Sequence, residues 1–205
     1  MDPFFAGMPP ATALVLAALS RELYDTRQMR RQLLSDTRCT CADAVLQAIT
    51  DGRLPEHPGW EAWLSLQLLE RHERHLQTRL DWRCRHPAAE AEPDGFDDSA
   101  ALAGLLQLPG GFLPPQHHPD GVALRGPDGL EVLVRWVSPQ AWSVEWTLGD
   151  AHWRLDTAPA AHAGVTASAH LHRPDGAVVD SPLVLDDTMA PLQRIVDALA
   201  RSPRL

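Results

Sequence analysis

The chain has 205 residues, a formal net charge of −9 and 44% hydrophobic residues. This length allows one large domain or two small ones, and the hydrophobic content is sufficient for a packed core. The acidic balance argues against nonspecific nucleic-acid binding, because contact with phosphates needs a positively charged surface. No DNA-binding surface is evident, and action on RNA would require a local cluster of arginine and histidine.

The cysteines and the hydropathy indicate a cytoplasmic protein. Cys39, Cys41 and Cys84 are an odd number and form no disulfide framework, which is typical of a reducing compartment. The longest apolar run, 11–19, is too short to cross a membrane. The residues before it lack the positive charge of a signal peptide. We therefore expect a soluble cytoplasmic protein with no membrane contact.

The first 86 residues have the periodicity of a helical domain. Helices are predicted over 10–35, 42–50 and 59–82. The stretch GRLPEHPGW, which precedes and begins the third helix, contains two prolines and is predicted to be a rigid loop. Residues 87–98 are rich in proline, alanine and acidic residues, and we expect them to link this domain, 1–86, to a second domain, 99–205.

After a predicted short helix over 100–108, the hydrophobic period changes to two. Three Pro-Asp-Gly sequences mark tight turns, because proline presets the turn and glycine allows a positive φ. Strands are predicted over 122–125, 130–137, 142–148, 151–156, 165–172 and 177–179. A final helix over 188–201 should pack on one sheet face. The expected fold class is α+β, with an N-terminal helical unit followed by an antiparallel sheet and a C-terminal helix.

A hairpin within the sheet fixes which side chains share a face. Gly149 and Asp150 form a predicted two-residue turn, which places Trp146 opposite Trp153. The apolar face then carries the tryptophans. The polar face carries Glu145, Thr147, His152, Arg154 and Asp156. If the strand over 165–172 joins this sheet, it adds His170 and His172 to the polar face.

Two histidines beside an arginine and carboxylates suit acid–base cleavage of a phosphodiester. One imidazole takes the 2′-hydroxyl proton, a second protonates the leaving oxygen, and arginine stabilises the charged transition state. The expected catalytic residues are His170, His172, Arg154 and Asp156, with Arg135 and His152 expected to bind substrate. A solvated face that only keeps the domain soluble would show the same pattern, and that alternative stays open.

Metal binding is a second alternative. Cys39-x-Cys41 and Cys84-x-His86 supply four ligand-type residues for zinc, but their spacing differs from the usual two-residue knuckle. We expect these residues to be unrelated, and we expect neither a metal nor another cofactor. A small zinc-dependent scaffold remains the third interpretation.

The C-terminal half resembles a known family. The run from Trp153 to Pro159, followed by His162 and by His170-x-His172 before Pro-Asp-Gly, resembles the C-terminal half of TumE-like toxins. The order of elements matches over about residues 120–201. Thr157 stands in place of the usual asparagine, and alanines replace the first of two histidines. The resemblance implies RNA-directed growth inhibition and adds His162 to the expected catalytic residues.

The N-terminal half is similar to the helical antitoxins encoded beside such toxins. The similarity lies in residues 48–58, which include Leu-Pro-Glu-His-Pro, and in the helix with Trp60 and Trp63; it covers about residues 20–80. Together the two resemblances imply a toxin–antitoxin-type protein whose RNA-cleaving domain, a metal-independent ribonuclease, is restrained by its own helical domain. RNA is the expected partner. The alternative is a non-catalytic interaction module in a defence or regulatory complex, which binds another protein or a second copy of the chain.

Overall fold

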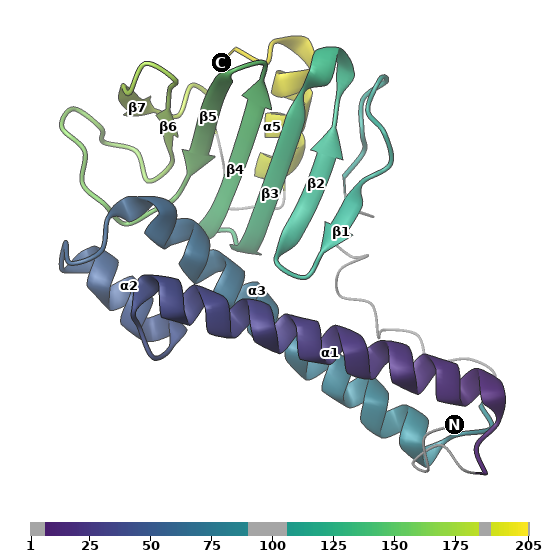
Figure 1. The fold of residues 1–205 in the computed structure, drawn as a ribbon. Coiled ribbons are helices and arrows are strands. Elements are labelled where there is room, and N and C mark those ends of the chain that lie inside the picture. Colours follow the sequence, from purple (N-terminus) through teal and green to yellow (C-terminus); the bar gives the residue numbers. More distant parts are fainter. Residues whose placement is uncertain (1–6, 90–105, 185–189, 205) are drawn as a thin grey trace.

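The computed structural model of the chain describes residues 7–89, 106–184 and 190–204. Within these ranges an N-terminal helical group is followed by a seven-stranded antiparallel sheet and a C-terminal helix (Figure 1). The predicted α+β class is therefore confirmed. None of the helices in the described ranges combines the length and apolar character that crossing a bilayer requires.

Two long helices form the N-terminal part. α1 (Pro10–Thr37) and α3 (Glu56–Arg85) run antiparallel to each other, and the short α2 (Ala42–Thr50) lies near their connecting end (Figure 1). Leucines at helical spacing hold the pair together, because one apolar stripe on each helix faces the other. This contact consists of Leu19, Leu23 and Leu76, with Val15 and Leu80 at its edges.

The sheet is a simple meander in which every strand pairs with its neighbours in the chain. Its strands are β1 (Gln116–His118), β2 (Gly121–Arg125), β3 (Glu131–Ser138), β4 (Ala141–Leu148), β5 (Ala151–Asp156), β6 (His170–His172) and β7 (Val178–Asp180). A 3₁₀ turn, η2 (Pro127–Gly129), connects β2 and β3 at one of the Pro-Asp-Gly sequences. The predicted hairpin register is confirmed, since Trp146 pairs with Trp153 and Glu145 with Arg154.

One strand was missed and another was predicted too long. The sequence did not predict β1, which pairs with β2. The strand predicted over 165–172 begins only at His170. The amides of Thr166 and Ala167 donate to the carboxylate of Asp180, at 2.7 and 2.9 Å, and so do not extend the ladder with β5.

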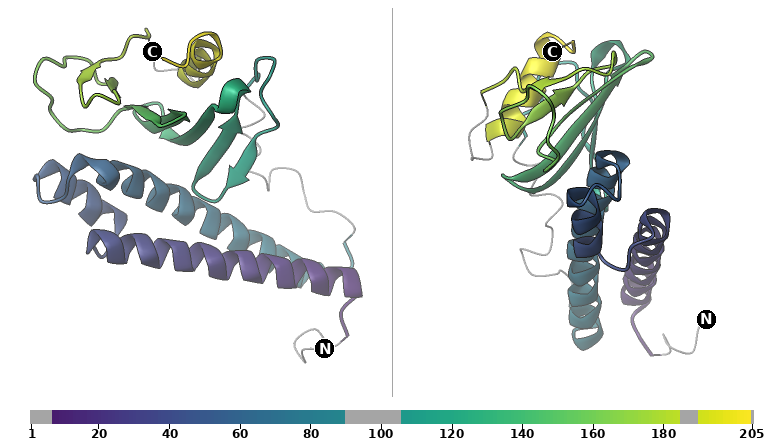
Figure 2. Two further views of the ribbon diagram at one scale, coloured as in Figure 1. Left: turned by 45° about the horizontal axis from the view of Figure 1, so that its top comes forward. Right: turned by 90° about the vertical axis from the view of Figure 1, so that its left-hand side faces the viewer.

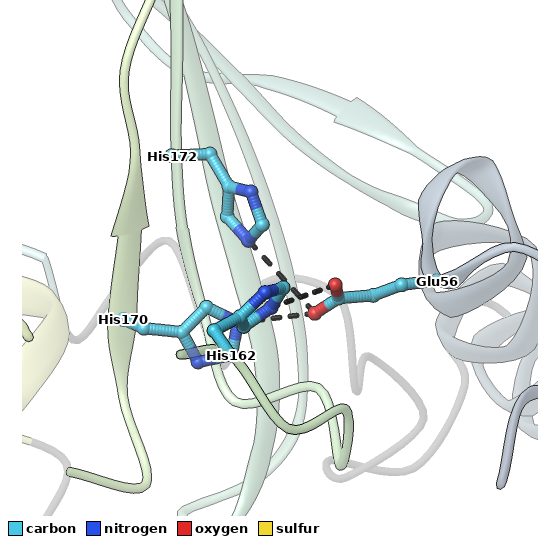
Figure 3. Close-up of side chains that lie close together, drawn as sticks. All are labelled: Glu56, His162, His170 and His172. Carbon is cyan, nitrogen blue, oxygen red and sulfur yellow. Dashed lines mark hydrogen bonds and ion pairs between the residues drawn. The ribbon is translucent and has the colours of Figure 1, made fainter. Parts of the chain in front are cut away.

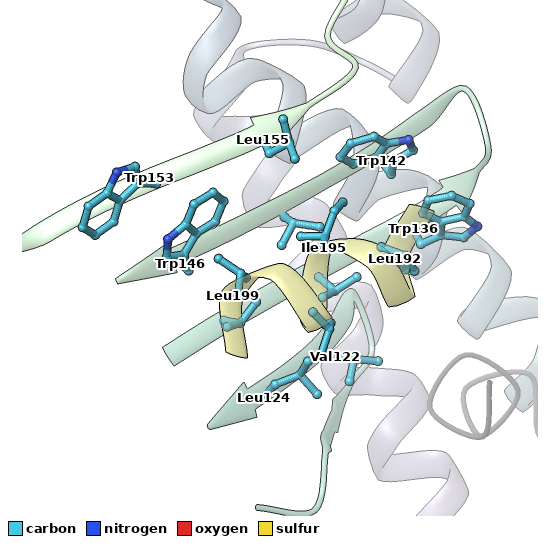
Figure 4. Packing of buried hydrophobic residues seen from close by; sticks show 14 of the residues in the cluster. Val122, Leu124, Trp136, Trp142, Trp146, Trp153, Leu155, Leu192, Ile195 and Leu199 are labelled. Carbon is cyan, nitrogen blue, oxygen red and sulfur yellow. The ribbon is translucent and has the colours of Figure 1, made fainter. Parts of the chain in front are cut away.

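The main hydrophobic core lies between the sheet and α5 (Ala190–Arg201) (Figure 4). The apolar residues of α5 pack on tryptophans and aliphatic residues of the central strands, as the sequence predicted for the C-terminal helix. Each fully buried side chain of this size stabilises the fold by about 1.5–3 kcal/mol. Deeply buried members include Trp142, Trp146, Leu155, Leu171, Leu192, Ile195 and Leu199.

The opposite, polar face of the sheet is covered in part by the N-terminal half of α3. Figure 2 shows the sheet between α5 on one side and the helical pair on the other. Trp60 is buried in this contact, and its Nε1 donates to the carbonyl oxygen of Trp142 at 3.3 Å. Trp60 packs with Leu64, Ala141 and Ala158. The helical part therefore docks directly on the face predicted to carry the functional residues.

The predicted linker and the predicted helix over 100–108 fall mostly outside the described residues. Residues 87–89 and 106–108 are described, and none of them is helical.

Truncation of Ile195 tests the core between α5 and the sheet. Ile195 is completely buried, so we expect Ile195→Ala to lower the free energy of unfolding by about 2–5 kcal/mol. Urea denaturation followed by tryptophan fluorescence measures this change. The control is Leu14→Ala on α1, where the side chain is 73% exposed and the expected change is below about 0.5 kcal/mol. Equal losses in the two variants would contradict this assignment of the core.

Candidate functional site

Six titratable side chains converge where the start of α3 meets strands β5 and β6 of the sheet. They come from two regions far apart in sequence. One is the start of α3, and the other is the continuous segment formed by the end of β5, the loop 157–169 and β6. Figure 3 shows four of them pointing toward one another. The cluster, called here the histidine–carboxylate cluster, consists of Glu56, His57, Asp156, His162, His170 and His172.

Strand geometry explains the sheet residues of the cluster. His170 and His172 are two positions apart on β6, so their side chains lie on the same face. Asp156 on β5 pairs with His170, and Arg154 pairs with His172. The sequence prediction that these four residues would lie together on the polar face is therefore confirmed.

The loop 157–169 brings His162 back to the strands. The side chain of Thr157 accepts from the amide of Trp142 at 3.0 Å and so fixes the start of the loop. Asp180 binds the amides of Thr166 and Ala167 and fixes its end. Between these anchors His162 reaches Glu56, with 2.8 Å between His162 Nε2 and Glu56 Oε2.

The start of α3 presents Glu56 and His57 to the sheet because the backbone is not helical there. His57 has φ −115° and ψ 132°, which is an extended conformation, and Pro58 follows it. Pro55 precedes Glu56, so prolines restrict the backbone on both sides. The helix proper begins at Gly59. The contact of Trp60 with the sheet holds this first turn in place.

Glu56 links the helical part to several histidines of the cluster. Its Oε1 lies 3.0 Å from His170 Nε2 and 3.8 Å from His172 Nε2, while its Oε2 contacts His162. One carboxylate from the helical part thus touches three imidazoles of the sheet part.

Asp156 lies beneath the histidines and is completely buried. Its Oδ1 accepts from the amide of Ala158 at 2.8 Å and is 3.4 Å from His170 Nε2. Its Oδ2 is 3.6 Å from His57 Nε2 and 3.7 Å from His172 Nε2. No hydrogen bond within the described residues reaches this second oxygen.

A second row of charges supports the cluster from behind. Glu61, one turn along α3, lies 2.8 Å from His57 Nδ1 and 2.8 Å from Arg154 Nε. Arg154 also reaches Glu145 at 3.4 Å. Glu61 therefore orients His57. It also neutralises Arg154, the residue expected to stabilise the charged transition state.

The carboxyl groups of the cluster have opposite pKa shifts. Burial alone would raise the pKa of Glu56, but the hydrogen bonds of His170 and His162 and the charge of His57 outweigh burial and lower the pKa to about 2. Asp156 is more deeply buried, and burial raises its pKa to about 6 despite the nearby His57 and the amide of Ala158. Glu56 therefore stays ionised well below neutral pH, whereas Asp156 gains a proton as the pH falls through about 6.

The two histidines of β6 also differ in pKa. Burial and the charge of His57 lower the pKa of His172 to about 4. Burial opposes protonation of His170 as well, but its hydrogen bond with Glu56 and the charge of Asp156 raise its pKa above the usual value. The pKa values of neighbouring imidazoles on one strand are thus shifted in opposite directions.

The cluster contains two overlapping sets of four potential metal ligands. One set is Glu56, His162, His170 and His172; the other is Glu56, His57, Asp156 and His172. The ligand atoms of each set lie within 4.8 Å of one another.

The cysteine pairs considered as a zinc site do not meet. Cys39 packs near Leu66, and Cys84 lies 18 residues further along α3, about 27 Å away at the helical rise. His86 stacks on Trp82, and its Nδ1 lies 3.0 Å from the Trp82 carbonyl oxygen.

The two residues expected to bind substrate lie outside the cluster. Arg135 and His152 both contact Glu145, and Arg135 Nε also donates to Ser65 Oγ at 3.0 Å. His152 lines a hollow of about 480 Å³ over strands β1–β5. Arg135 lines a separate hollow of about 360 Å³ beside Glu61.

Sequence reasoning missed Glu56, His57 and Glu61 as members of the site. The sequence places Glu56 and His57 in a proline-containing loop and in the stretch that resembles antitoxins, but it assigns them no role in the site. A signal was present, since a glutamate and a histidine held between two prolines form a rigid presentation of two ligand-type side chains.

Comparisons of the chain with protein-family models, curated proteins and solved structures found no match. The resemblance to TumE-like toxins and their antitoxins therefore depends on the residues quoted from the sequence. Function is inferred below from the geometry of the cluster together with that resemblance.

Removal of the Asp180 carboxylate tests how the loop with His162 is anchored. We expect Asp180→Ala to speed hydrogen exchange at the amides of Thr166 and Ala167 by at least about tenfold, because both amides lose their acceptor. Residue-resolved exchange by NMR measures this. The control is Asp175→Ala, which removes only the acceptor of the Ala177 amide in the next turn. Unchanged protection at Thr166 in the Asp180 variant would refute the anchoring role.

Proposed function

We propose that the chain is a toxin–antitoxin-type protein in which the sheet part cleaves RNA and the helical part restrains it. The proposal depends on one observation above all. All five residues expected to be catalytic contact the N-terminal end of α3, within residues 56–61. Glu56 meets His162, His170 and His172; His57 meets Asp156; and Glu61 meets Arg154.

The chemistry proposed for the free sheet part is acid–base cleavage of a phosphodiester. His170 and His172 have ring centroids 5.0 Å apart on the same face, which supports assigning one of them as the base and the other as the acid. Arg154 pairs with His172 across the strands and would stabilise the negative charge that develops on the phosphate. These are the roles that the sequence pattern predicted for the three residues.

Occupation by α3 is incompatible with those roles. Glu61 of α3 binds the guanidinium of Arg154 and so competes with a substrate phosphate for it. The carboxylate of Glu56 lies against the three histidines, where the substrate phosphate would bind. It would repel the phosphate, because both groups are negatively charged. The resemblance of residues 20–80 to antitoxins supports the same arrangement, with inhibitor and enzyme in one chain.

The test is a full-length double variant, Glu56→Gln with Glu61→Gln. We expect it to cleave RNA at least about tenfold faster than the parent chain, because both carboxylates that occupy the catalytic residues lose their charge. Degradation of a labelled RNA, followed by gel electrophoresis, measures the rate. Adding His170→Ala and His172→Ala to the double variant should abolish the gain.

The matched control is Glu70→Gln with Glu73→Gln on the same helix. These carboxylates pair with Arg27 and Arg30 of α1 and do not touch the cluster, so RNA cleavage should stay at the level of the parent chain. If the Glu56/Glu61 variant keeps its circular dichroism spectrum and leaves RNA intact, RNA cleavage is refuted and the non-catalytic interaction module becomes the better account.

A further inference from the structure

We propose that the histidine–carboxylate cluster binds one divalent first-row transition-metal ion, held by residues of both the helical part and the sheet part. Glu56 and His172 belong to both ligand sets, and the remaining ligands come from His57, Asp156, His162 and His170. The site is carried by ligand geometry alone and does not require that the protein cleave RNA.

The spacing of the donor atoms fits a single ion. Ligands bound at about 2.1 Å lie about 3.0 Å apart around an octahedral ion and about 3.4 Å apart around a tetrahedral one. His57 Nε2 lies 3.1 Å from His172 Nε2 and 3.6 Å from Glu56 Oε1. Asp156 Oδ2 lies 3.6–3.7 Å from the same two imidazole nitrogens.

The contacts of His57 suit a metal ligand. Its Nδ1 lies 2.8 Å from Glu61, and a carboxylate only accepts hydrogen bonds, so Nδ1 carries the proton. Nε2 is thereby left as the nitrogen that can offer a lone pair to an ion, and it lies 3.1 Å from His172 Nε2. A carboxylate that binds the outer nitrogen of an imidazole is the arrangement that orients histidine ligands in metal sites.

Asp156 gives an independent indication. The residue is completely buried, and its Oδ2 lies among imidazole nitrogens with no hydrogen bond from the described residues. A buried carboxylate oxygen without a partner costs free energy. A cation bound at Oδ2 would remove that cost, while Oδ1 keeps the amide of Ala158.

The donor types select the class of ion. One set offers three imidazoles with one carboxylate and the other two imidazoles with two carboxylates. Either suits Zn²⁺, Co²⁺, Fe²⁺, Mn²⁺ or Ni²⁺, whereas Ca²⁺ and Mg²⁺ prefer all-oxygen sites. No thiolate takes part within the described residues. His57, His162 and His172 are each 17–20% exposed, so the ion can reach the site from solvent.

The ion would also fasten the two parts of the chain together. Glu56 and His57 belong to α3, and the other ligands belong to the sheet part, so binding requires both in place. One further consequence rests on the proposed function. The metal-bound form is the restrained form, because the ion occupies the imidazoles that must be free for RNA cleavage.

The experiment titrates the full-length chain, freed of metal by dialysis against EDTA, with Co²⁺ and separately with Zn²⁺. We expect one equivalent to bind, with a shift and intensification of the visible Co²⁺ bands relative to aqueous Co²⁺ as the sign that protein ligands have replaced water. Isothermal titration calorimetry gives the affinity. His172→Ala should weaken binding by at least about 100-fold, since loss of a ligand exceeds the 10–100-fold effect of an outer partner. Glu61→Gln should weaken binding within that 10–100-fold range.

Two further variants keep the result interpretable. His162→Ala changes a loop residue that the fold does not need for its core, so a loss of affinity there cannot be attributed to unfolding. His117→Ala changes an exposed histidine on β1, outside the cluster, and should bind Co²⁺ within about twofold of the parent chain.

The outcomes separate the two proposals. Less than about one tenth of an equivalent bound, or equal affinity in the His172 and His117 variants, overturns the metal site. If the parent chain binds stoichiometric metal and the Glu56/Glu61 variant leaves RNA intact, RNA cleavage is refuted and the metal site is supported. If that variant cleaves RNA and the parent chain binds no metal, RNA cleavage is supported and the metal site is refuted.

Discussion

The arrangement of this protein depends on one carboxylate, Glu56, placed among three imidazoles. Its contacts with His162, His170 and His172 join the start of α3 to a strand and a loop that lie more than a hundred positions later in the chain. Charged groups become costly when they leave water unless each finds a partner. Glu56 and the histidines satisfy this condition only together, so the position of α3 and the shape of the cluster determine each other.

The two faces of the sheet are covered by different physical means. On one face α5 buries aliphatic and tryptophan side chains, an attraction that is roughly proportional to area and has little directional preference. On the other face α3 has a small apolar contact around Trp60, and beyond it the contacts are ion pairs and hydrogen bonds. Contacts of the second kind respond to ionic conditions and to bound cations, so the two interfaces differ in what controls them.

Much of this could be predicted from the sequence. Alternation and the Gly149–Asp150 turn determined the register of β4 and β5, because a shift of one residue would have turned Trp146 and Trp153 to the wrong face. The same alternation placed His170 and His172 on the polar face. These are local rules, which act between residues close in sequence or directly paired across a hairpin.

The remainder depended on long-range docking that no local pattern reports. Glu56 and His170 are 114 positions apart, and nothing in the periodicity of α3 states which surface its first turn will meet. The strand predicted over 165–172 shortened for a similar reason, since the carboxylate of Asp180 captured two of its amides. A side-chain acceptor from another strand can replace a ladder partner, and propensity does not reveal it.

The length of α3 has a mechanical consequence for the cluster. Ser65 and Arg71 contact the sheet beyond Trp60, so α3 projects past the sheet only after Arg71, over about 21 Å to Arg85 at the helical rise. The cluster lies on the other side of these contacts, at the non-helical residues Glu56 and His57. Motion at the far end of α3 would therefore reach the cluster only through three contacts with the sheet, which separate the histidines from the projecting part of the helix pair.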